Sequence, residues 1–99
     1  MKAKEYADRV LAMNTEQEAI SETGKCLEEM LFEMRDLIRK CKIGSDKGII
    51  PVIKEFDQKY RKFVDLISVK WEDVFSYNGF MSMLNHVSPK VYEYYQANK

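Results

Sequence analysis

Apolar side chains recur at helical spacing along most of the chain, and this period constrains the fold more than any other feature. In residues 15–42 the stripe repeats every seven residues, at Ile20, Leu27, Met34 and Cys41, and Met30, Leu31, Leu37 and Ile38 fill the positions between. Such a stripe follows one face of an α-helix and has to be buried against other helices. The pattern predicts one long helix over about residues 15–42.

Two local signals bear on this helix. Thr15-Glu16-Gln17-Glu18 matches a capping box, in which the Thr hydroxyl and the last Glu carboxylate each accept a backbone amide left free at a helix start. Gly24 costs about 1 kcal/mol of helix propensity relative to Ala, so the helix is either continuous, kinked or split there. We expect a continuous helix in which Gly24 permits close approach of a neighbouring backbone.

The rest of the chain divides into further helical segments. A first stripe comprises Ala3, Tyr6, Ala7, Val10 and Leu11, and a third comprises Ile53, Phe56, Tyr60, Phe63, Val64, Ile67, Trp71 and Val74. The glycines and turn-forming residues of positions 43–48 indicate a loop, and Pro51 fits the first turn of a helix over about residues 50–75. Residues 76–79 break the pattern, before short helices at residues 80–87 and from Ser88-Pro89 onward.

These segments predict an all-α fold. We expect an antiparallel helical bundle with two long central helices, at about residues 15–42 and 50–75, and shorter helices towards the N- and C-termini. A chain of 99 residues has room for one hydrophobic core, so we expect a single domain over residues 1–99.

Composition excludes several classes of protein. The 45% hydrophobic content and the balance of 16 basic against 16 acidic residues argue against a disordered chain. A sequence pI near 6.6 removes the simplest argument for nucleic-acid binding. No apolar run approaches the roughly 18–20 residues of a bilayer span, and the polar start is unlike a signal peptide. Cys26 and Cys41 would be about 22 Å apart on one helix, so we expect reduced thiols and a cytoplasmic protein.

Enzymatic chemistry finds little support in the sequence. His86 is the one histidine available as a base, and its neighbours make it an ordinary residue at the edge of a bundle. Glu22, Glu29, Glu33 and Asp36 share one face of the long helix, but without the Glu-x-x-His motif of di-metal bundles we expect them to face solvent. We therefore expect no enzyme, no cofactor and no metal.

A basic region near the loop offers a nucleic-acid alternative. Arg35, Arg39, Lys40, Lys42 and Lys47 form the candidate patch for an anionic partner. The sequence Lys59-Tyr60-Arg61-Lys62-Phe63 also interleaves basic and aromatic residues as single-strand binders do, although Tyr60 and Phe63 fall on the core stripe. Cations at the end of a helix also complement its dipole, which explains the charges of residues 35–42 without any ligand.

An interaction module is the interpretation we favour. Phe32, Tyr77 and Tyr94 fall off the predicted stripes, and exposed aromatic residues are enriched at protein interfaces. They form our candidate partner surface, with the alternative that short terminal helices cover them. The long stripes could equally be shared between two copies of the chain, which predicts self-association, for example as a homodimer.

The segments Lys2-Ala3-Lys4-Glu5-Tyr6-Ala7-Asp8 and Val52-Ile53-Lys54-Glu55-Phe56-Asp57-Gln58-Lys59-Tyr60 resemble small, uncharacterised helical proteins of phages and mobile elements in gut bacteria. The resemblance covers about a fifth of the chain. It implies a bacterial or phage cytoplasm and an accessory role such as host-factor binding, assembly or regulation, and it implies no particular activity or site.

Overall fold

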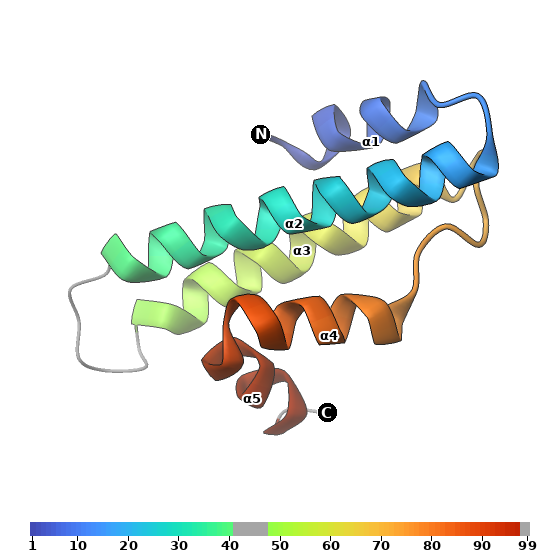
Figure 1. The fold of residues 1–99 in the computed structure, drawn as a ribbon. Coiled ribbons are helices and arrows are strands. Elements are labelled where there is room, and N and C mark those ends of the chain that lie inside the picture. Colours follow the sequence, from blue (N-terminus) through green and yellow to red (C-terminus); the bar gives the residue numbers. More distant parts are fainter. Residues whose placement is uncertain (41–47, 98–99) are drawn as a thin grey trace.

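Five helices make up most of the computed structural model, which describes residues 1–40 and 48–97. They are α1 (Ala3–Leu11), α2 (Glu16–Lys40), α3 (Ile49–Ile67), α4 (Tyr77–Val87) and α5 (Pro89–Ala97). The expected all-α class is confirmed, since no strand occurs in the described part of the chain. In Figure 1, α2 and α3 lie side by side, α1 lies along one side of this pair, α4 lies along the other, and α5 folds back against α4.

Helix α2 is continuous through Gly24, as expected. Thr15 acts at its start, where the Oγ1 atom accepts a hydrogen bond from the Glu18 amide at 3.2 Å. The expectation that Gly24 permits a close backbone approach is wrong, because a Cβ atom built there would meet nothing within 4 Å. Residues 41 and 42, which the sequence assigned to this helix, lie outside the described residues.

Helix α3 ends earlier than the predicted residue 75. Its last turn closes at Ser68, whose amide and hydroxyl both donate to the Val64 carbonyl, at 3.0 and 2.7 Å. The amide of Trp71 then bonds the Ile67 carbonyl in a turn. Trp71 and Val74 nevertheless pack on the core from the connection to α4, so an apolar spacing that mimics a helix arises there without helical backbone.

The predicted break at residues 76–79 is instead the start of α4. Ser76 is its N-cap, and its Oγ atom accepts a hydrogen bond from the Gly79 amide at 3.2 Å. Helix α5 begins at Pro89 as predicted. Tyr95 ties α5 to α3, since its hydroxyl donates to Asp57 Oδ1 at 3.1 Å.

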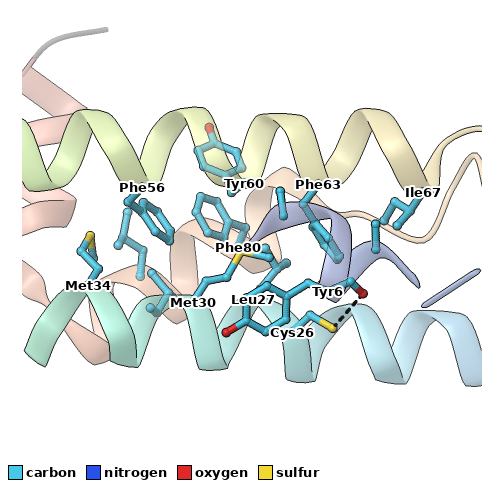
Figure 2. Packing of buried hydrophobic residues seen from close by; sticks show 14 of the residues in the cluster. Tyr6, Cys26, Leu27, Met30, Met34, Phe56, Tyr60, Phe63, Ile67 and Phe80 are labelled. Carbon is cyan, nitrogen blue, oxygen red and sulfur yellow. Dashed lines mark hydrogen bonds between the residues drawn. The ribbon is translucent and has the colours of Figure 1, made fainter. Parts of the chain in front are cut away.

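The core lies between α2 and α3 and is closed on its two sides by α1 and α4. Figure 2 shows Met30, Phe56, Phe63 and Phe80 directed into it. The Phe80 ring of α4 lies 4.6 Å from the Tyr60 ring and 5.9 Å from the Phe56 ring, measured between centroids. Such contacts between aromatic rings stabilise the fold in addition to the free energy gained by burying their apolar surface.

Two members of the predicted stripe are not in the core. Ile20 and Leu37 are each 47% exposed, whereas Leu27, Met30, Leu31 and Met34 are buried as predicted. The reason is the unequal length of the helices: α2 has 25 residues, but α1 has nine and α4 eleven, so the flanking helices cannot cover α2 throughout.

The connection after α3 also reaches back to α1. Lys70 Nζ donates to the carbonyl oxygens of Leu11, at 2.8 Å, and Met13, at 3.1 Å. A cation at this position complements the negative end of the α1 dipole and satisfies carbonyls that the helix leaves free.

Among the described helices, none has both the length and the apolar character needed to cross a bilayer.

Candidate interaction surface

Helix α1 contacts both α2 and α3 along the groove between them. Its buried face comprises Ala3, Tyr6, Ala7 and Val10, at the spacing that the sequence predicted. Tyr6 is the largest of these side chains and is 1% exposed. Its backbone carbonyl lies 3.6 Å from the Cys26 thiol, which donates a weak hydrogen bond across the interface (Figure 2).

Glu33 of α2 connects three parts of the chain. Its carboxylate accepts hydrogen bonds from the amino group of Met1 at 3.1 Å, from the Tyr6 hydroxyl at 2.9 Å and from Lys59 Nζ of α3 at 3.1 Å. Partial burial opposes ionisation of Glu33, but these three donors outweigh it and hold the pKa of the carboxyl group below its ordinary value. The ionised form of Glu33 therefore stabilises the packing of α1 on α2 and α3.

Arg9 forms the second polar attachment of α1. Its guanidinium lies 2.7 Å from Glu22 and 2.6 Å from Glu29, both on α2, and the two carboxylates raise the pKa of Arg9. The expectation that Glu22, Glu29, Glu33 and Asp36 face solvent is therefore wrong for Glu22 and Glu33, which are partly buried, whereas Glu29 is exposed although it is paired with Arg9. All three bind cations of α1 and α3, while Asp36 is exposed.

A hollow continues this groove beyond the N-terminal end of α1. It lies between the C-terminal half of α2 and the first half of α3, lined by Met30, Glu33, Met34, Leu37, Val52, Glu55, Phe56 and Lys59. Met34 and Phe56 are buried, Val52 is half-buried, and Leu37 is 47% exposed. We call this feature the open groove. The sequence did not indicate it, because its position depends on where α1 stops.

The predicted partner surface is spread over three helices. Phe32 lies on α2, half-buried, with the Arg35 guanidinium 4.5 Å from the centre of its ring. Tyr77 is 48% exposed in the first turn of α4. Tyr94 of α5 is half-buried and packs edge-on against Tyr95, with ring centroids 6.1 Å apart. The structure does not unite these residues in one hollow: Tyr94 lines one with Ile49 and Ile50, and Tyr77 lines two others.

Three residues of the predicted basic patch can be located. Arg35 is half-buried, and its Nε atom is buried with no hydrogen-bond partner among the described residues. Arg39 and Lys40 are exposed in the last turn of α2. Lys42 and Lys47, the other two members of the patch, lie outside the described residues.

The groups considered for catalysis are dispersed in the described part of the chain. His86 is exposed in the last turn of α4. Cys26 is buried as a free thiol, and burial raises its pKa to about 11, which disfavours the reactive thiolate. A search of the described residues finds no group of three or more His, Cys, Asp or Glu side chains placed to hold a metal ion.

No protein-family model, curated protein or solved structure matches this chain.

Proposed function

We propose that the chain is a non-enzymatic helical interaction or assembly module that binds another protein or a second copy of itself. The observation that carries this proposal is the incomplete cover of the central hairpin, which leaves large apolar side chains exposed beside a hollow. A role as an accessory protein of a phage or mobile element, in a bacterial cytoplasm, is part of this proposal and is supported by the sequence resemblance.

The exposed apolar residues lie where the shorter helices stop. Leu37 is uncovered beyond α1, Tyr77 begins α4, and Val69, in the connection after α3, is 87% exposed. Removing apolar surface from water contributes about 25 cal/mol per Å², and apolar side chains of this kind dominate the centres of protein interfaces. A partner that covers them would therefore gain binding energy that the isolated chain leaves unused.

Self-association needs a different argument from the one that the sequence suggested. Leu27, Met30 and Met34 of the long stripe are at most 4% exposed within a single chain, so the stripe does not require a second copy to cover it. A homodimer would instead have to use the exposed residues, such as Leu37 or Tyr77.

Affinity capture with the intact chain, in cells that carry its gene, tests the proposal. We expect one protein to be enriched in stoichiometric amounts, and to be enriched less by the double variant Leu37→Gln/Tyr77→Gln. Light scattering tests the homodimer by measuring the molar mass in solution, which should be twice 11.7 kDa if the chain forms a dimer. A monomer at high micromolar concentration together with no stoichiometric partner would contradict the proposed function.

A nucleic-acid-binding regulator is the second candidate, and the end of α2 favours it. The Arg35 guanidinium lies over the Phe32 ring, and its Nε atom has no hydrogen-bond partner among the described residues. Neither Arg39 nor Lys40 forms an ion pair with a described residue. Fluorescence anisotropy with labelled single- and double-stranded oligonucleotides at low salt tests this candidate. We expect Arg39→Gln/Lys40→Gln to weaken any binding and the control Lys54→Gln/Lys62→Gln, on α3, to have less effect. No binding in low salt removes the candidate.

A further inference from the structure

We propose that the open groove binds a short amphipathic helix of a partner protein, seated end to end with α1. This inference rests on the proposed function and names the surface and the kind of partner. It depends on three observations. The groove continues the interface that α1 occupies, most of its lining residues are apolar, and the carboxylate of Glu55 in the lining forms no ion pair with a described residue.

The continuity of the groove follows from Glu33 and Lys59. Glu33 accepts hydrogen bonds from the Met1 amino group and the Tyr6 hydroxyl at the N-terminal end of α1, and Lys59 donates to Glu33. Both Glu33 and Lys59 also line the open groove. Beyond Glu33, where the N-terminal end of α1 is held, α2 continues for seven residues to Lys40, which is about 10 Å at 1.5 Å per residue. A second helix of about two turns can therefore contact α2 and α3 there without displacing α1.

The lining defines the side chains that fit. Of its lining residues, Met34 and Phe56 are buried, whereas Leu37 and Val52 are accessible to a partner. The cavity has a volume of about 40 Å³, which accepts the tip of one apolar side chain, while Leu37 and Val52 contact its neighbours. Met adapts its shape to different apolar groups. The occupant therefore needs apolar residues at positions i, i+3, i+4 and i+7, the spacing that α1 itself uses.

The charges define the polar face of the occupant. Lys59 is already paired with Glu33, whereas the exposed Glu55 carboxylate forms no ion pair with any described residue. A Lys or Arg on the partner helix would complement Glu55. An extended peptide is disfavoured, because both walls are helices whose backbone groups are already hydrogen-bonded. A nucleic acid is disfavoured within the groove, because its lining contains the carboxylates of Glu33 and Glu55 and the one ammonium group of Lys59.

Selection of helical peptides from a display library against the intact chain tests the inference. We expect the selected peptides to share the i, i+3, i+4, i+7 apolar spacing with a basic residue. We expect Leu37→Gln to weaken their binding about tenfold. Ile20→Gln is the matched control, because it makes the same change on the same helix at the same 47% exposure, and it should leave binding unchanged.

Methionine methyl groups locate the bound peptide by NMR. We expect the signals of Met30 and Met34, in the open groove, to shift on binding, and those of Met81 and Met83, on α4, to stay in place. Shifts confined to Met81 and Met83, or an equal loss of affinity in the two glutamine variants, would show that the open groove is not the binding site. Either result would leave the proposed protein-binding function intact. Failure to select any helix would overturn the inference, and affinity capture would still decide the function independently.

A peptide that replaces α1 would also overturn the end-to-end arrangement. Displacement of α1 uncovers Cys26, which lies beneath Tyr6. Thiol labelling followed by mass spectrometry distinguishes Cys26 from Cys41, and we expect no faster labelling of Cys26 when the peptide is bound.

Discussion

Glu33 accepts hydrogen bonds from α1 and α3 at once, so the charge of this one side chain affects how three helices are held together. Its pKa in the folded protein is lower than its ordinary value, which means that the folded state favours the carboxylate. The resulting stabilisation is present above the ordinary Glu pKa of about 4.3 and is lost as the pH falls through the folded-state pKa.

Glu33→Gln should lower the free energy of unfolding at pH 7 by up to about 1 kcal/mol, because the side chain is partly exposed and its ion pairs are screened by water. The difference from the wild type should shrink as the pH falls below the ordinary Glu pKa and through the lower folded-state pKa of Glu33, because Glu33 itself then becomes neutral. Urea denaturation at pH 7 and pH 3 measures this difference. Glu28→Gln, at an exposed position on α2, is the control, and an equal difference at both pH values would contradict the assignment.

Gly24 is a position at which a substitution should stabilise the protein. Gly24→Ala should raise the free energy of unfolding by about 0.4–1 kcal/mol, because Ala restricts the unfolded chain and the added Cβ meets nothing within 4 Å. Chemical denaturation measures the gain. Destabilisation by this substitution would contradict the open space beside Gly24 in a helical backbone.

At the scale of helices, the sequence predicts the elements that depend on local signals. The start of α2 follows from Thr15, the start of α5 from Pro89, and the face of α1 from Tyr6 and Val10, because caps and spacing act within a few residues. The end of α3 could not be predicted in this way. Trp71 and Val74 continue the apolar spacing after the helix has ended, because the core also accepts side chains from a connecting segment.

The candidate surface depends on contacts between distant residues and was therefore largely missed. Leu37 has the spacing of a core residue, and its exposure follows only from the length and position of α1. The pairing of Arg9 with Glu22 and Glu29 joins two helices, so no local rule reveals it. One usable signal was present: a cation on the first helix and two carboxylates seven residues apart on the next.

Arg9→Gln should loosen α1 while leaving the other helices in place. The substitution removes both ion pairs to α2, and Cys26 beneath α1 should then react about five- to tenfold faster with a thiol reagent, in a Cys41→Ser background. Wild-type reaction should be slow, since burial raises the thiol pKa to about 11. Arg61→Gln removes an ion pair within α3 and is the control, so equal acceleration in both variants would contradict this role of Arg9.

At the scale of the whole molecule, one cluster of buried residues draws on α1, α2, α3, α4 and α5. The chain carries no net charge, yet its charges are sorted along α2: carboxylates of the first part attach α1, and the basic last turn is exposed. A net charge of zero therefore does not describe the surface of α2, where acidic residues form ion pairs with α1 and basic residues of the last turn are exposed to solvent.

Phe80→Ala should destabilise the entire molecule and not α4 alone. Loss of a ring that packs on Phe56 and Tyr60 costs about 3–5 kcal/mol, a large part of the 5–15 kcal/mol typical of a domain. Because the core is shared, circular dichroism should show one transition at a lower temperature. Val69→Ala, at a position 87% exposed, should change little, and a two-step melt of the Phe80 variant would contradict a single core.

The bonds from Lys70 to the carbonyl groups of Leu11 and Met13 join positions 59 and 57 residues apart, and they bear on the order in which the chain is made. Helix α1 leaves the ribosome before α3, which forms the larger part of its binding surface and follows tens of residues later. At 5–20 residues per second this delay is about 3–12 s. During that time the apolar face of α1, with Tyr6 and Val10, lacks the part of its native binding surface that α3 provides, so this face is accessible to a nascent-chain chaperone.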